Sequence, residues 1–101
     1  MNMQRLMQEA QKMQAQLQKD QKELEKTVFE GSSSLVSLKI NGKYEVTEVK
    51  INLPEGEGLE ADDKEMLEDM VMVAMNDALN KIAADKEKKI GKYGQGLAGL
   101  M

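Results

Sequence analysis

The chain contains no cysteine, no histidine and no tryptophan, and it has one proline in 101 residues. Without cysteine there are no disulfides and no thiolate chemistry, and without histidine as well the usual zinc and iron ligand sets are excluded. Only three residues are aromatic. Methionine, leucine, valine and isoleucine must therefore fill the core of what we expect to be one small domain.

Recognisable catalytic and ligand-binding motifs are also absent. Residues 94–99, "GQGLAG", match the spacing of the dinucleotide fingerprint, but that motif requires a strand before it and a helix after it. The acidic residues between 55 and 63 lack the spacing of a calcium-binding EF-hand loop. We therefore expect no enzyme activity, no catalytic residues, no metal site, no cofactor and no small-molecule substrate.

Long hydrophobic runs are missing too, since no run approaches the roughly 18 apolar residues of a membrane span. The first residues are too polar for a secretory signal, so we expect a cytoplasmic location and no membrane contact. The formal net charge is -4, but it is unevenly spread. Residues 55–69 hold eight carboxylates and one lysine, whereas residues 81–101 hold five lysines and two carboxylates. Because salt screens exposed charges beyond about 8–10 Å, basic ends can act locally.

The first 26 residues contain an apolar pattern typical of a helix that packs against another helix. Apolar side chains recur at the a and d positions of a heptad, with one polar interruption at Asp20. They are Met3, Leu6, Ala10, Met13, Leu17 and Leu24.

Three short strands are predicted next. Residues 27–31 and 35–40 are rich in β-branched and apolar side chains, and a third strand ends before Pro54. Asn41 and Gly42 predict a type I′ hairpin turn between the second and third strands. The apolar parity changes along the third strand, which predicts a β-bulge near Thr47 or Glu48.

A second helix is predicted from a capping box of Asp62 and Glu65 to a glycine cap at Gly91. The fold class is therefore α+β, in the order helix, three-stranded antiparallel sheet, helix. Residues 1–92 form the domain, and we expect residues 93–101 to be a glycine-rich flexible tail.

The second helix has too much apolar surface for one small sheet, since positions 70–75 are all apolar. A helix that is apolar around most of its circumference is usually buried on more than one side. We therefore expect a homodimer. The predicted interface residues are Met66, Met72, Val73 and Leu79. An ordinary monomer with exposed methionines is the alternative.

The segments "LVSLKINGKYEVTEVKINL" (35–53) and "DDKEMLEDMVMVAMNDALNKI" (62–82), after a Gln- and Met-rich helix, resemble the YbaB/EbfC family of bacterial nucleoid-associated proteins. The resemblance spans nearly the whole chain. It implies an α-β-β-β-α protomer, a tweezer-like homodimer with projecting helices, and binding to double-stranded DNA in the nucleoid.

Two basic stripes are the predicted contacts for DNA. Arg5, Lys12, Lys19 and Lys26 recur every seven residues, about 10.5 Å apart along a helix. Lys81, Lys88, Lys89 and Lys92 gather near the end of the second helix. The alternatives are a solvated coiled-coil position for the first stripe and compensation of the helix dipole for the second.

These observations predict a nucleoid-associated protein that contacts DNA phosphates as a homodimer, with a role in nucleoid organisation and gene regulation. The alternative from a different class is a protein-interaction module or holdase resembling prefoldin subunits, which also flank a β-hairpin with helices.

Overall fold

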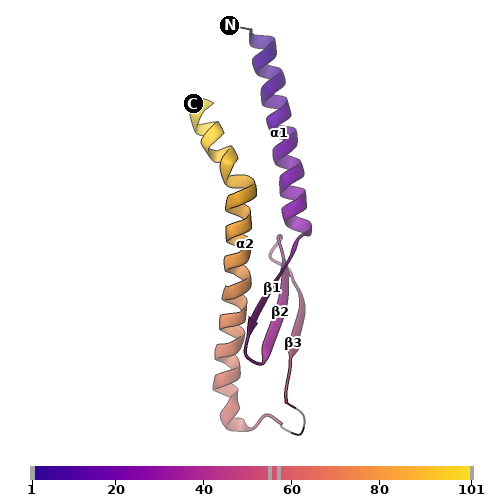
Figure 1. Ribbon diagram of the computed structural model, residues 1–101, viewed down its shortest axis with the longest axis vertical. Helices are drawn as coiled ribbons and strands as arrows, with labels where there is room; N and C mark the ends of the chain where they lie inside the picture. The colour runs from indigo at the N-terminus through magenta and orange to yellow at the C-terminus, as the bar shows by residue number, and fades with distance from the viewer. Residues whose placement is uncertain (1, 55, 57, 101) are drawn as a thin grey trace.

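The computed structural model describes residues 2–54, 56 and 58–100, and for residues 94–100 it describes the backbone (Figure 1). It confirms the predicted order of helix, three-stranded antiparallel sheet and helix. The elements are α1 (Met3–Lys26), β1 (Val28–Ser33), β2 (Val36–Asn41), β3 (Val46–Ile51), a 3-10 turn η1 (Ala61–Asp63) and α2 (Lys64–Leu100).

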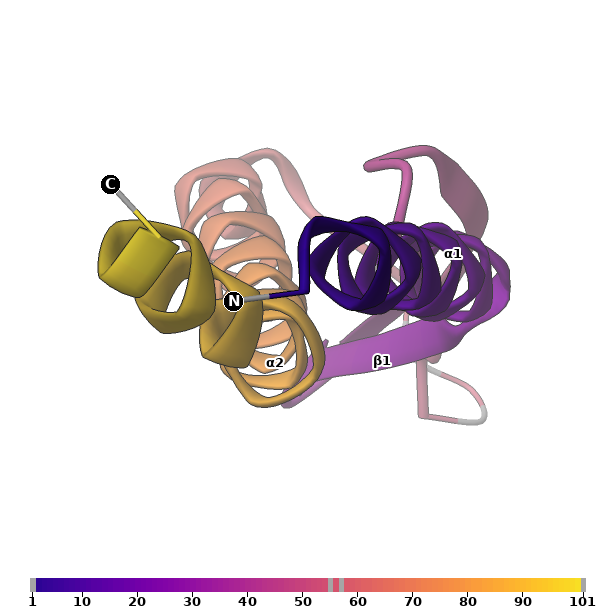
Figure 2. The ribbon, with the colours of Figure 1, turned by 90° about the horizontal axis from the view of Figure 1, so that it is seen from above.

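The molecule is an extended bar measuring 73 × 20 × 14 Å. The sheet has the order β1-β2-β3, and α2 packs over β1 and β2. Beyond the end of the sheet, α1 continues beside the C-terminal half of α2, so both chain ends lie at one end of the bar (Figure 1). Seen along the long axis, the two helices are neighbouring rods (Figure 2).

The core forms where the alternation of β2 meets the helical spacing of α2. Val36, Leu38 and Ile40 are buried on one face of the strand, and the buried helix residues are Ala74, Ala78 and Ile82. The close packing requires small residues, because a Cβ at Gly31 would lie 2.0 Å from the carbonyl oxygen of Ala74. Leu67, Met70, Val71 and Met75 also pack against this core, so α2 covers the sheet with a broad apolar face.

The β2–β3 hairpin and its bulge are confirmed, but the predicted type I′ turn is wrong. Lys39 pairs with Glu48 and Ile40 pairs with Val46, so Thr47 is the extra residue. The turn has its one positive φ at Tyr44 (67°), and not at Asn41 or Gly42. Asn41 instead shapes the turn with its side chain, because its Oδ1 accepts hydrogen bonds from the backbone N–H groups of Lys43 (2.9 Å) and Glu45 (3.0 Å).

Gly42 is required for contact with α1 and not for a left-handed conformation. Its N–H donates to the Thr27 carbonyl oxygen at 3.1 Å, and a Cβ there would lie 1.9 Å from the carbonyl oxygen of Leu24. The hairpin turn is therefore docked tightly against the C-terminal end of α1.

Both predicted ends of the second helix are corrected. The cap is formed two residues earlier, where the Glu60 N–H donates to Asp63 Oδ2 at 3.0 Å and one 3-10 turn precedes α2. At the other end, α2 does not stop at Gly91 but continues to Leu100. The mobility expected for residues 93–101 stays a prediction, as does the domain boundary at residue 92. Neighbouring strand ends shift slightly, with β1 reaching Ser33 and β3 ending at Ile51.

Candidate nucleic-acid interface

The first basic stripe lies on the part of α1 that projects beyond the sheet. Arg5, Lys12, Lys19 and Lys26 are all exposed, and every described residue of α1 before Met13 is exposed as well. The helix begins with Asn2 as its cap, whose Oδ1 accepts from the N–H of Gln4 at 3.1 Å. An uninterrupted helix of 24 residues thus presents the four cations along one line at regular spacing.

The four cations differ in whether they form ion pairs. Arg5 Nε lies 3.5 Å from Glu9 Oε1 across one helical turn, with both side chains mostly exposed. Lys12, Lys19 and Lys26 form no ion pair with any residue that the structure describes. A lysine without a carboxylate partner keeps its charge available for a phosphate. These three lysines are the strongest candidates within the stripe.

Most of the basic residues predicted on the second helix have a structural partner. Lys81 Nζ donates to the Glu30 carbonyl oxygen at 2.7 Å and lies 3.6 Å from Asp77 Oδ2, which ties α2 to the β1 edge. Lys89 pairs with Asp85 at 3.0 Å. Lys92 lies 3.6 Å from Asp20 Oδ2.

Lys88 is different, because it is exposed and forms no ion pair among the described residues. Of the four lysines predicted on this helix, it alone resembles the unpaired lysines of α1. The four lysines of the second predicted stripe therefore lie on one helix, but three of them form ion pairs with carboxylates of the same chain.

Two further lysines, Lys22 and Lys43, lie close to the first stripe, and the sequence analysis did not identify them. Lys22 and Lys26 line a groove between the end of α1 and the β2–β3 turn, and Lys43 lines its other side. Glu25 and Glu45 share this groove, so its charge is mixed. Lys22 and Lys43 are 21 residues apart in the sequence. They line the same groove because Gly42 packs against the end of α1, and the sequence alone does not show this contact.

A polar link joins the two helices above the sheet. Tyr93 Oη donates to Asp20 Oδ2 at 2.6 Å, and Gln16 Nε2 donates to Asp20 Oδ1 at 3.0 Å. Both Asp20 and Tyr93 are buried. The hydrogen bond from Tyr93 lowers the pKa of the Asp20 carboxyl, with Gln16 and Lys92 adding to the effect against the opposing cost of burial. The polar interruption at Asp20 in the heptad is the sequence signal of this link, and it sets the spacing between the helices.

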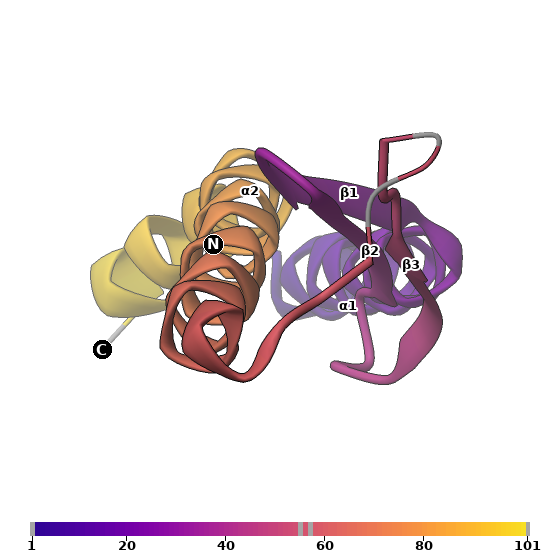
Figure 3. The same cartoon turned by 90° about the horizontal axis from the view of Figure 1, so that it is seen from below.

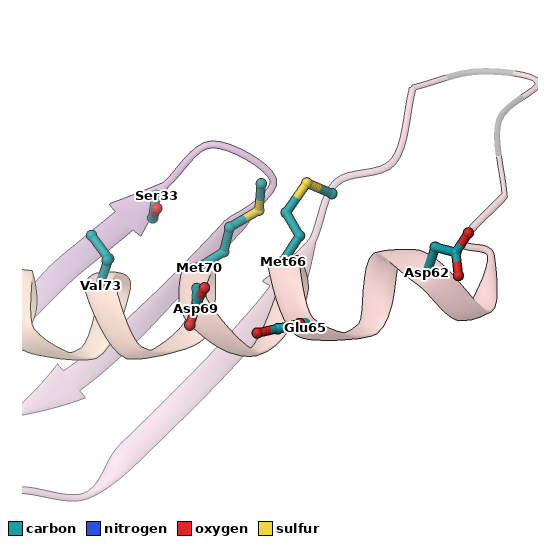
Figure 4. A pocket seen from close by; sticks show the side chains of 7 residues that line it. All are labelled: Ser33, Asp62, Glu65, Met66, Asp69, Met70 and Val73. Atoms are coloured by element: carbon teal, nitrogen blue, oxygen red, sulfur yellow. The ribbon is translucent and has the colours of Figure 1, made fainter.

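The four residues predicted for a dimer interface lie on two different sides of α2. Met66, Met72 and Val73 are exposed, whereas Leu79 packs partly against the core of its own chain. Figure 4 shows Met66 and Val73 on one side, above a shallow hollow. Its lining is completed by Ser33, Asp62, Glu65, Asp69 and Met70.

The charge of the molecule is divided along its length. The acidic residues between positions 58 and 69 lie at the sheet end of the bar, and the basic stripe of α1 extends to the other end (Figure 1). No cluster of three or more candidate metal ligands occurs among the described residues. Nor does any described helix combine the length and apolar character needed to cross a membrane. The arrangement suits an extended anionic ligand at the end where the helices project.

Comparisons with known proteins agree with this geometry. A model of the YbaB/EbfC DNA-binding family matches residues 1–97. A nucleoid-associated protein of Ligilactobacillus salivarius is 40% identical, covering 99% of this chain and 95% of its own length. A nucleoid-associated protein of Legionella pneumophila is 43% identical, covering 95% and 84%.

The fold has also been seen in a crystal structure. The uncharacterized protein HP0035 from Helicobacter pylori superposes with a TM-score of 0.68 at 20% identity, covering 87% of this chain and 91% of that one. At this identity the likeness concerns the fold alone, and it supports the order and packing of helices and strands described above.

Proposed function

The chain belongs to the YbaB/EbfC DNA-binding family, and on that premise we propose that it is a nucleoid-associated protein that contacts the phosphates of double-stranded DNA as a homodimer. The family binds DNA and is not enzymatic, which agrees with the absence of catalytic motifs from the sequence. We propose that this protein is located in the cytoplasmic nucleoid and takes part in nucleoid organisation and gene regulation.

One observation carries the phosphate-contact proposal. Lys12, Lys19 and Lys26 are exposed, evenly spaced and without an ion-pair partner among the described residues, on a helix that projects from the sheet. Side chains on one line of a straight helix can follow a phosphate backbone without entering a groove, so they supply affinity with little base readout. In a homodimer each contact occurs twice.

The test is the salt dependence of DNA binding. Each phosphate that a lysine neutralises adds roughly 0.9 to the slope of log affinity against log salt. Replacing Lys12, Lys19 and Lys26 together by glutamine should lower this slope by about 0.9 for each phosphate that is no longer neutralised. Mobility-shift or fluorescence titrations over a series of salt concentrations measure it.

A matched control removes the same charge elsewhere. Lys39, Lys50 and Lys64 are exposed or half-exposed and pair with nearby glutamates on the sheet and at the start of α2. Replacing these three by glutamine changes the net charge equally but should leave the slope near that of the unmodified protein. Equal slopes for the two triple variants would contradict phosphate contact by α1.

The prefoldin-like holdase is kept as a second candidate because of the tip of α1. Met3, Leu6 and Met7 are exposed there, and exposed apolar side chains at the end of an arm are suited to an unfolded client. Retention on DNA at low salt, set against protection of a denatured client from aggregation, separates the two candidates.

A further inference from the structure

One acidic side chain is buried between the two helices, at a position where an apolar residue would normally pack. Asp20 occupies a d position of the α1 heptad and is 8% exposed. It is the one buried residue with a charged side chain among those that the structure describes. The lysines proposed to contact DNA lie on another face of α1, so phosphate binding by these lysines does not account for the buried carboxylate.

Three donors surround the Asp20 carboxylate, and two of them come from α2. Tyr93 Oη donates to Oδ2 at 2.6 Å, and Lys92 Nζ lies 3.6 Å from the same oxygen. Gln16 Nε2, one turn earlier on α1, donates to Oδ1 at 3.0 Å. Lys92 Nζ also lies 5.1 Å from the centroid of the Tyr93 ring, within the range of a cation–π interaction. We call the cluster of Gln16, Asp20, Lys92 and Tyr93 the interhelix link.

Stability alone does not explain why a carboxylate occupies this position. Taking a charged group out of water is costly, and buried ionic groups can often be replaced by apolar residues of similar size without loss of stability. A leucine at position 20 would simply continue the apolar seam of α1. A single polar residue within such a seam has a better-established use, which is to fix the register of one helix against the other.

The link lies at the last point where α1 is firmly held. Leu24, one turn toward the sheet, belongs to the core. Met13 and Leu17 are half-buried, and every described residue before Met13 is exposed. The two helices are neighbours in the views from both ends of the bar (Figure 2, Figure 3). From Asp20 toward the N-terminus, therefore, no further described residue of α1 is buried.

The link also sets the direction in which the basic stripe of α1 points. Lys19 immediately precedes Asp20, so its side chain lies about 100° around the helix from the carboxylate. Lys12 is on the same line as Lys19, about two turns further out. Hydrogen bonds are directional and can fix this rotation, whereas a seam of methionine and leucine is non-directional and adaptable. Because the Asp20 side chain is fixed toward α2, the line of lysines is held at a fixed angle to α2.

The length of α1 amplifies any small movement at the link. The helix from Asp20 back to Met3 is about 25 Å long at about 1.5 Å per residue. A tilt of about 10° at Asp20 would therefore move Met3 by about 4 Å. Successive phosphates of one DNA strand are about 3.4 Å apart along the duplex axis. An arm that tilts freely would lose its register with the phosphates, and ordering it on binding would reduce the affinity.

From these observations we propose that the interhelix link positions α1 for DNA binding, with Asp20 and Tyr93 as positioning residues that act through Lys12 and Lys19. The proposal rests on the phosphate contacts of the proposed function. The link holds α1 at one rotation and tilt, so that its lysines contact phosphates at the same time. Simple electrostatics gives the opposite expectation for Asp20, because removing a negative charge near the lysines should strengthen the attraction for DNA.

Tyr93→Phe tests the proposal without changing the net charge, because it removes only the hydroxyl group that donates to Asp20. DNA affinity should fall by about tenfold, since the freed arm must be ordered on binding. The slope of log affinity against log salt should fall by about 0.9 or more, since fewer phosphates are neutralised together. Tyr44→Phe is the matched control, because it removes the same group from an exposed tyrosine of the β2–β3 turn. A Tyr93→Phe variant whose slope or affinity equals that of Tyr44→Phe would overturn the proposal.

An apolar replacement of the link separates positioning from stability. Asp20→Leu combined with Tyr93→Phe should be as stable as the unmodified protein, or more stable, in urea unfolding. DNA affinity should nevertheless fall at least as far as in Tyr93→Phe, although a negative charge has been removed. Binding that is unchanged or tighter, or that weakens only together with the stability, would overturn the proposal, because the link would then be structural only.

The positioning role and the phosphate contacts can fail separately. Equal salt slopes for the triple variant of α1 and its triple-lysine control would show that the phosphate contacts themselves are wrong. If those two slopes differ and Tyr93→Phe leaves the slope unchanged, the phosphate contacts stand and only the positioning role of the link is wrong.

Discussion

At the scale of single residues, the role of a lysine is decided by its neighbours and not by its spacing. Lys81 and Lys92 continue a regular pattern in the sequence, yet one holds the β1 edge and the other lies beside buried Asp20. Lys12 and Lys19 follow an equally regular pattern and have no such partner among the described residues. Spacing could therefore place the basic residues on helix faces. It could not show which charges were engaged, because the Lys81 partner Glu30 is 51 residues away in sequence.

The hydrogen bond between Tyr93 and Asp20 predicts an unusual titration. Accepting this bond lets Asp20 raise the pKa of the Tyr93 phenol to about 12 from an ordinary value of 10.0. A raised pKa means that the bond adds stability below pH 10, which is lost as the pH rises through about 12. The lowered pKa of the Asp20 carboxyl works in the other direction. Its contribution is present above the ordinary value of 3.8 and is lost as the pH falls through the lowered pKa.

An ultraviolet titration checks this prediction. The chain has two tyrosines, so a Tyr44→Phe variant reports Tyr93 alone. We expect its phenol to ionise at about 12, and the additional change Asp20→Asn should bring the pKa down toward the ordinary value, because the negative charge is gone. Ionisation near the ordinary value with Asp20 intact would show that the link between the helices is absent in solution.

At the scale of elements, local signals predicted where helices and strands occur better than where they end. The strands, the bulge and the apolar face of α2 followed from alternation and helical spacing. The glycine signal at Gly91 was overridden, because Ile90 packs against the core and Tyr93 is anchored on Asp20 beyond it. Such contacts between distant segments can outweigh the cost of one glycine within a helix, about 1 kcal/mol. The turn at Gly42 was misassigned for a similar reason, since its constraint comes from α1.

Replacing Gly91 by alanine distinguishes a continuous helix from a helix end at this position by the sign of the effect. In a continuous helix alanine should stabilise the protein by about 0.5–1 kcal/mol. The new Cβ would meet only the end of the Glu87 side chain, which can move aside. At a left-handed helix cap the same change would be destabilising. Thermal or urea unfolding gives the answer, and a loss of stability would mean that α2 ends at Gly91.

At the scale of the whole molecule, charge and apolar surface divide the bar into parts with different roles. The acidic residues between positions 58 and 69 lie at the sheet end, and the lysines of α1 that have no ion-pair partner among the described residues lie toward the other end. Exposed apolar residues of β3 run along the side of the sheet. The sequence predicted an excess of apolar surface, a homodimer and four interface residues, which are Met66, Met72, Val73 and Leu79; the interface residues stay a prediction. The sequence could not show that α2 covers β1 and β2 while leaving β3 open, because no local pattern specifies this packing.

The homodimer that we propose for this chain should form even without DNA. Light scattering coupled to size-exclusion chromatography, on the unmodified protein at micromolar concentration without DNA, tests it most directly. We expect a molar mass of twice 11.3 kDa. A mass of 11.3 kDa under the same conditions would contradict the homodimer, because the exposed β3 side chains of Val46, Val49 and Ile51 would then have no partner chain to cover them.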